Sequence, residues 1–149
     1  MYSAVQATLH AMIEHLNADR WAEVVKTYDY PFVLNVRGRM MVLHSPDDAM
    51  EAWQIFRGSM TAKGHMNSSV RLTALELPRA GRFRAWAELT HTDAAGKVSG
   101  QSKIIYYFRD HGDHHRLEMQ SVIAPVLPRF QALAQSIRKA SSRVASGHR

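Results

Sequence analysis

Apolar side chains recur at three- and four-residue spacing in the first part of the chain, which is the pattern of a helix with one buried face. This spacing predicts a helix from about Ser3 to Asn17. It also predicts a second helix from about Asp19 to Tyr28. Pro31 sets the end of this helix, because a proline restricts the residue before it to extended geometry. The apolar face of the second helix is expected to hold Trp21, Val24, Val25 and Tyr28.

A third helix is predicted to follow a short extended hairpin. The hairpin consists of a strand from Phe32 to Val36 and a turn at residues 37–39. Ser45 is typical of a helix N-cap, Pro46 suits the first helical position, and two aspartates then face the positive end of the helix dipole. Gly64 is a suitable C-terminal stop. The apolar stripe of this helix is expected to hold Met50, Trp53, Phe56 and Met60.

The following segment alternates between apolar and polar residues, and glycine-containing turns divide it into four strands. The pattern predicts an antiparallel meander with strands Val70 to Leu77, Phe83 to Thr92, Val98 to Arg109 and His115 to Ile123. In the last strand, alternation places Leu117, Met119, Ser121 and Ile123 on one face and Arg116, Glu118, Gln120 and Val122 on the other. Alternation leaves open which face is concave.

The C-terminal segment differs in charge from the rest of the chain. Residues 129–149 contain five basic residues and no acidic one, so they carry +5 of the net charge of +6 and leave +1 for residues 1–128. Phe130, Leu133, Ala134 and Ile137 follow helical spacing there. We therefore expect a domain over residues 1–128, and a basic amphipathic helix with a frayed tail over residues 129–149. The tail lacks interleaved aromatic residues, so nucleic-acid binding is not expected.

Composition excludes several classes of site. The 149 residues are 46% apolar, which suits one folded domain, and they include no cysteine, which excludes disulfides, thiolate nucleophiles and cysteine zinc sites. Residues 1–20 do not resemble a signal peptide, and no apolar run approaches the roughly 20 residues of a membrane span. We expect a cytoplasmic protein without membrane contact.

The order of these elements resembles the NTF2-like superfamily, also called the SnoaL-like or cystatin-like α+β cone. The run from Tyr28 to Leu34 looks like the start of the first strand in many small bacterial members, and the resemblance covers roughly residues 3–124. It implies an α+β cone with three N-terminal helices packed on a curved antiparallel sheet, and homodimers that pair through the sheet. The C-terminal helix predicted from the spacing of the tail follows this cone. Members include isomerases, dehydratases, polyketide cyclases, epoxide hydrolases and binding proteins, so the fold alone does not fix an activity.

The catalytic groups of one such enzyme class are missing. The ketosteroid isomerases in this superfamily use a tyrosine on the first helix, a carboxylate base on the first strand and an aspartate on the penultimate strand. The matching positions here fall at Met12, near Asn35 or Val36, and near Ile105. None of the three positions offers the group that this chemistry requires there: a tyrosine, a carboxylate base or an aspartate. Isomerase chemistry of that type is therefore not expected.

Histidine is abundant, with nine residues, but its positions favour ordinary roles. His91 would act as a base if its ring points into a cavity, although a strand-end histidine near solvent is the commoner case. The run from His111 to His115 combines imidazole and carboxylate groups that suit transition metals. It lies in a predicted turn, where adjacent ligands seldom converge, so we expect neither a metal site nor a cofactor.

A cone places its cavity between the first helix, the third helix and the concave face of the sheet. Small-molecule sites commonly combine an aromatic lining with a few polar groups. The candidates for such a site are Tyr30, Asn35, Trp53, Phe56, His91, Tyr106 and Ser121. The opposite face, solvent-facing or a dimer surface, is expected to hold Trp86, Glu88, Gln101, Lys103, Glu118 and Gln120.

Two functions remain open from the sequence. In the first, the protein holds a small, largely apolar ligand, either as a binding protein or as an enzyme of lyase, isomerase or hydrolase type. In the second, it is a non-enzymatic interaction or accessory module whose cavity is filled by side chains, because a residue such as Trp53 or Phe56 is more often plain core.

Overall fold

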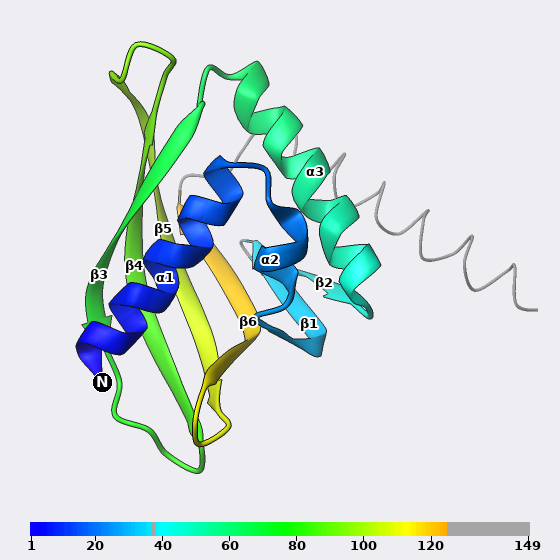
Figure 1. The fold of residues 1–149 in the computed structure, drawn as a ribbon, viewed down its shortest axis with the longest axis vertical. Coiled ribbons are helices and arrows are strands. Elements are labelled where there is room, and N and C mark those ends of the chain that lie inside the picture. The colour runs from blue at the N-terminus through cyan, green and yellow to red at the C-terminus, as the bar shows by residue number, and fades with distance from the viewer. Residues whose placement is uncertain (37, 125–149) are drawn as a thin grey trace, which may run out of the picture.

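The computed structural model describes residues 1–36 and 38–124, which form a six-stranded sheet with three helices on one face (Figure 1). The elements are α1 Tyr2–Asn17, α2 Trp21–Val25, β1 Tyr28–Val36, β2 Arg39–Leu43, α3 Pro46–Ala62, β3 Asn67–Leu75, β4 Arg82–Thr92, β5 Val98–Asp110 and β6 His115–Ala124. Their order agrees with the prediction. The predicted C-terminal helix and tail, and the boundary at residue 128, lie outside the described residues.

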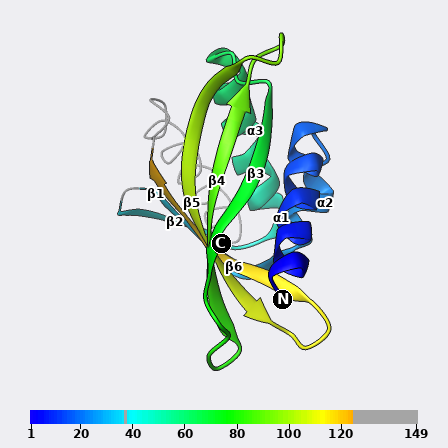
Figure 2. The same cartoon turned by 90° about the vertical axis from the view of Figure 1, so that its left-hand side faces the viewer.

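The strands are arranged in the order β2-β1-β6-β5-β4-β3. Strands β3 to β6 form the predicted antiparallel meander. The expectation of a wholly antiparallel sheet is wrong at one pair, because β1 and β6 run parallel. After α3 the chain enters the sheet at β3, which is the edge opposite β2. Strands β4, β5 and β6 then add in turn towards β1, so that β6 lies beside β1 and runs in the same direction. The sheet curves around the helices (Figure 2).

Helix α1 lies along the edge strand β3, and its side chains form hydrogen bonds with backbone groups of β3 that no neighbouring strand pairs. The Asn17 amide donates to the Ser68 carbonyl oxygen (2.8 Å) and accepts from the Ser68 N–H (2.9 Å). Near the other end of α1, the Gln6 side chain accepts from the Leu72 N–H, and the Tyr2 hydroxyl donates to the Leu72 carbonyl oxygen. Unpaired backbone groups on an edge strand favour unwanted pairing, so these bonds both orient α1 and protect the edge.

Helix α2 is shorter than predicted. It ends at Val25, and Tyr28 is not on its apolar face but is the first residue of β1. Tyr28 is fully buried, stacks on Phe32 with ring centroids 4.1 Å apart, and is paired with Leu117 of β6. Aromatic residues suit a strand, and this pairing with a distant segment outweighs the local helical spacing. Pro31 lies inside β1, in the stretch where the pairing with β6 is irregular.

Helix α3 begins where the sequence predicts. The Ser45 hydroxyl accepts a hydrogen bond from the Asp48 N–H (3.2 Å), and the Asp48 carboxylate accepts one from the His44 N–H (3.1 Å). The first bond satisfies a backbone donor that a helix start leaves free, and the second holds the residue before the cap against the first turn. Among the described residues, neither α3 nor any other helix has the length and apolar content to cross a membrane.

Strand β6 contains a bulge that reverses its alternation. Phe108 is paired with Leu117, whereas the preceding Tyr107 is paired with Met119, so Glu118 is an extra residue on β6. Beyond this point the predicted face assignment is wrong. Gln120 and not Ser121 turns towards the helices, and Gln120 is only 3% exposed.

Candidate functional site

A cavity lies between the helices and the concave face of the sheet. The space between these elements is about 1070 Å³ when the part open to solvent is included. Each of the three helices and six strands contributes at least one side chain, and most of these are aliphatic or aromatic. The polar residues on the wall are Asn17, Arg57, Ser68, His91, Ser102 and Gln120.

His91 is the central polar residue of this wall. Its ring is 4% exposed, with Nδ1 2.7 Å from the Ser68 hydroxyl and Nε2 2.8 Å from the Ser102 hydroxyl. In a neutral imidazole one nitrogen donates and the other accepts, so one serine accepts from the ring and the other donates to it. Burial, followed by the neighbouring His65, lowers the pKa of His91 from 6.5 to about 4. His91 is therefore uncharged at neutral pH.

The strand pairing explains how this group forms. Ser68 of β3 lies directly opposite His91 of β4, and Gly100 of β5 lies opposite His91 on the other side. Because Gly100 has no side chain, the His65 ring fits over it, with its centroid 5.2 Å from that of His91. Burial, followed by the charge of Lys63, lowers the pKa of His65 as well.

Arg57 is the cationic residue on the described part of the wall, and it is already paired. Its guanidinium donates to the Met66 carbonyl oxygen and lies 3.4 Å from the Asp19 carboxylate. No carboxylate is among the wall residues from the described ranges 1–36 and 38–124. The cavity is thus predominantly apolar, with a fixed and neutral hydrogen-bonding group.

No protein-family model and no curated protein sequence matches this chain. Solved structures do match its fold. A domain of unknown function with a cystatin-like fold from Nostoc punctiforme superposes with a TM-score of 0.67 at 12% identity, over 97% of this chain and 94% of that one. The chain has the NTF2-like, or cystatin-like, fold.

Two further structures with this fold carry informative descriptions. One is the β subunit of a putative aromatic-ring-hydroxylating dioxygenase from Novosphingobium aromaticivorans, with a TM-score of 0.62 at 16% identity over 89% of this chain and 94% of that one. The other is a Catenulispora acidiphila protein in complex with S-DNPA, with a TM-score of 0.60 at 14% identity over 82% of this chain and 91% of that one. At these identities the similarity establishes the NTF2-like fold and not an activity.

The NTF2-like cavity brings together four of the seven residues predicted as a site. They are Trp53, Phe56, His91 and Tyr106. Their role in ligand binding remains a prediction. For His91, the commoner arrangement of a strand-end histidine near solvent does not hold, because its ring is buried.

The other three candidates are not on the cavity wall. The Tyr30 hydroxyl donates to the Val25 carbonyl oxygen (2.9 Å). Asn35 and Ser121 are paired neighbours on β1 and β6, and each alternates with wall residues, so both point to the outer face of the sheet. Of the positions that match isomerase catalytic groups, Met12 is on the wall, whereas Asn35 and Ile105 face outward.

Sequence reasoning missed polar wall residues for identifiable reasons. Ser68 lies before the predicted start of its strand, and Gln120 was assigned to the opposite face because a bulge has no clear sequence signal. Ser102 could have been found, since it alternates with Ile104 and Tyr106 along β5.

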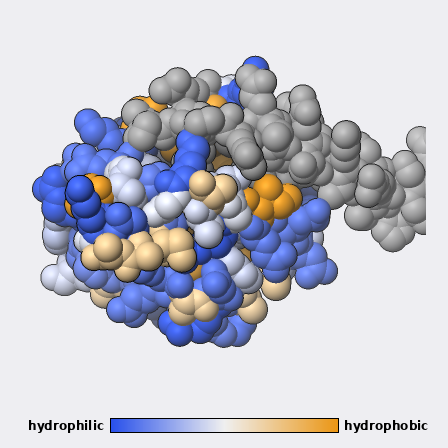
Figure 3. Space-filling view, turned by 90° about the horizontal axis from the view of Figure 1, so that it is seen from above, coloured by the Kyte–Doolittle hydropathy of each residue, from blue (hydrophilic) through white to orange (hydrophobic). Residues whose placement is uncertain are grey.

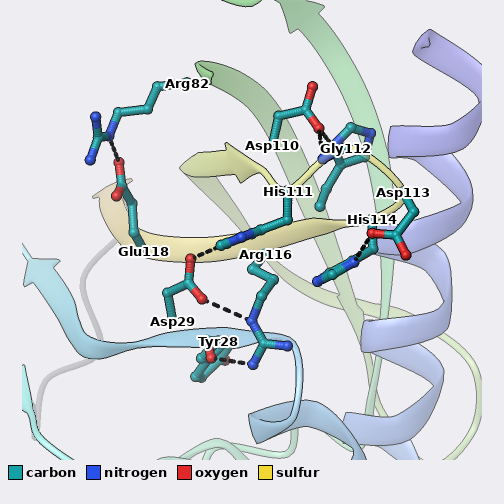
Figure 4. A network of polar contacts seen from close by, with 11 residues as sticks. Tyr28, Asp29, Arg82, Asp110, His111, Gly112, Asp113, His114, Arg116 and Glu118 are labelled. Carbon is teal, nitrogen blue, oxygen red and sulfur yellow. Dashed lines mark hydrogen bonds and ion pairs between the residues drawn. The ribbon is translucent and has the colours of Figure 1, made fainter. Parts of the chain in front are cut away.

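Side chains in and beside the histidine-rich turn between β5 and β6 contact the start of β1 (Figure 4). Asp29 of β1 lies 2.7 Å from His111 Nε2 and accepts from Arg116 Nε at 2.8 Å, while Arg116 also donates to the Tyr28 carbonyl oxygen. Within the described residues, no three histidine or carboxylate side chains are placed to hold a metal ion. This cluster ties the turn to the start of β1.

Proposed function

We propose that the protein binds a small, largely apolar and uncharged molecule in the cavity of its NTF2-like cone. The observation that carries this proposal is the composition of the wall. Apolar side chains surround His91, whose two ring nitrogens are fixed by Ser68 and Ser102. Such a wall favours burial of an apolar surface and provides few interactions for a charged one.

Proton-transfer chemistry has less support than binding. A general base works best when its pKa lies near the working pH, but the pKa of His91 is lowered to about 4 and its nitrogens already have partners. The described wall also offers no carboxylate. A lyase, isomerase or hydrolase activity is therefore the second candidate, with His91 as its base. The structure in complex with S-DNPA supports a role in holding small molecules in this fold.

A thermal-shift screen of small apolar compounds tests the proposal. Compounds that bind in the cavity should stabilise the wild type and Asn35→Leu, because Asn35 lies on the outer face. They should stabilise Ala52→Leu less, because Ala52 is a buried wall residue and a larger side chain there occupies the cavity. Equal stabilisation of Ala52→Leu and wild type, or no stabilising compound at all, would contradict a binding function. A role as a non-enzymatic interaction or accessory module would then be favoured.

We also propose that two copies pair through the outer face of the sheet. Met40 and Val42 of β2 are 57% and 41% exposed and point away from the helices, and Ile123 of β6 is similarly exposed. In contrast, the end of the molecule where α3 finishes is mainly hydrophilic (Figure 3). Light scattering should give a dimer for the wild type and a monomer for Met40→Glu/Val42→Glu. A monomeric wild type would refute this pairing.

A further inference from the structure

The three polar side chains at the centre of the cavity wall contain more hydrogen-bond donors than they use among themselves. Each serine hydroxyl carries one hydrogen, and the neutral His91 ring carries one more, on either Nδ1 or Nε2. These hydrogens serve only two contacts, between Nδ1 and the Ser68 hydroxyl (2.7 Å) and between Nε2 and the Ser102 hydroxyl (2.8 Å). One hydroxyl hydrogen is therefore left over, whichever tautomer the ring adopts.

The tautomer of His91 decides which serine holds the spare hydrogen. If Nδ1 carries the ring hydrogen, the Ser68 hydroxyl accepts from it, Ser102 donates to Nε2, and the hydrogen of Ser68 stays free. If Nε2 carries the ring hydrogen, the roles are exchanged and the hydrogen of Ser102 stays free. A change of tautomer thus moves the free donor between β3 and β5, on either side of the ring.

In the part of the chain that the structure describes, no other protein group accepts this hydrogen. The hydroxyls of Ser68 and Ser102 are bonded to His91 alone. Both serines belong to the cavity wall and are partly exposed, whereas the ring between them is buried. The amide of Asn17 and the guanidinium of Arg57, on the same wall, already donate to backbone carbonyl oxygens. The serine pair therefore presents an uncommitted donor to the cavity.

We infer that Ser68 or Ser102 donates this hydrogen to the carbonyl oxygen of an otherwise apolar ketone or aldehyde. A carbonyl oxygen only accepts, so it uses the spare hydrogen and adds none that would need a further acceptor. A hydrocarbon ligand would displace water from the donor and leave it without a partner, which is unfavourable. This inference rests on the proposed function and specifies the class of ligand as an apolar carbonyl compound.

Tetralin and its ketone 2-tetralone share one ring skeleton, so the ratio of their dissociation constants measures recognition of the oxygen. We compare the Kd ratio of tetralin to 2-tetralone, obtained by NMR titration, in His91→Leu and in Ser68→Ala/His91→Leu/Ser102→Ala. These two variants differ only in the two hydroxyls. His91→Leu keeps both hydroxyl hydrogens without their ring partner. Its ratio should therefore be about tenfold higher than that of the triple variant.

The infrared stretching frequency of the bound ketone provides a second readout. A hydrogen bond to the carbonyl oxygen lowers this frequency relative to that of 2-tetralone in cyclohexane. We expect the lowering in the wild type and in His91→Leu, but not in the triple variant. Asn35→Leu is the control and should behave as the wild type, because Asn35 lies on the outer face of the sheet. If the variants at position 91 do not fold, the wild type and Ser68→Ala/Ser102→Ala form the corresponding pair.

The outcomes separate this inference from the proposed function. If both compounds bind and the Kd ratio is the same in His91→Leu and the triple variant, donation by the serines is refuted while a binding function stands. The same conclusion holds if the frequency of the ketone bound to the wild type equals that in cyclohexane. If neither compound binds the wild type, carbonyl recognition is also refuted, and the thermal-shift screen decides the binding function separately.

Discussion

Acidification should destabilise this protein through His91. The pKa of His91 is lowered from 6.5 to about 4 by burial and by His65, so the unfolded chain binds a proton at higher pH than the folded one. The stability contributed by the neutral ring is therefore fully present above about pH 6.5 and is lost as the pH falls towards 4. At about 1.36 kcal/mol per pKa unit, this shift corresponds to a contribution of at most about 3 kcal/mol to the free energy of unfolding. We expect a contribution of roughly 2 kcal/mol, because solvent screening through the cavity reduces the effect.

Protonation acts on a specific contact. A protonated ring has only donors, so the serine hydroxyl that donates to His91 loses its acceptor and must turn away. His91→Gln retains a donor and an acceptor at this position but does not titrate. Urea unfolding of the wild type and His91→Gln at pH 7 and pH 4.5 isolates the contribution of the ring, because the other titrating groups are common to both proteins. The exposed His10 provides the control variant His10→Gln.

On going to pH 4.5, the wild type should lose about 2 kcal/mol more unfolding free energy than His91→Gln. His10→Gln should lose as much as the wild type. The ring proton signal of His91 in NMR should titrate with a midpoint near pH 4. An equal loss in the wild type and His91→Gln, or a midpoint near 6.5, would refute the argument that burial keeps this ring neutral.

Three further predictions concern stability. Ser45→Ala removes the cap of α3 and should lower the unfolding free energy by about 1 kcal/mol in urea unfolding, and an unchanged value would contradict a capping role. Asn17→Leu removes both hydrogen bonds to the Ser68 backbone and should cost about 1–3 kcal/mol; hydrogen exchange should then be faster in β3 than in β5, and a uniform change would count against edge protection. Gly100→Ala places a Cβ 2.9 Å from His65 Cε1 and should lower the melting temperature, and the loss should be smaller in the His65→Ala background if this contact causes it.

Local signals were sufficient to predict most of the secondary structure. The cap at Ser45, Pro46 at the first helical position and the apolar spacing predicted α3 within one or two residues. The glycine-containing turns at Gly81, Gly96 and Gly112 separated the strands of the meander, and all three glycines have positive φ. Such features depend on residues a few positions apart, so the sequence contains them directly.

The end of α2 could not be found in this way. Helical spacing extends from Trp21 to Tyr28, but Tyr28 pairs with Leu117, which is 89 positions away in the chain. A contact of this range does not appear in a local pattern. It nevertheless decides where the helix ends and the sheet begins.

Caps, turns and hydrophobic periodicity are local, so the amino-acid sequence was enough to predict most element types, their order and the resemblance to the NTF2-like cone. Which of the candidate side chains share the cavity depended on strand pairing, and the sequence predicted only part of that set. The bulge at Glu118 turned the side chain of Gln120, and not that of Ser121, towards the cavity. The strand register placed Ser68 opposite His91. Alternation defines two faces of a strand, but only pairing with its neighbours decides which face is buried, and the site is formed on that face.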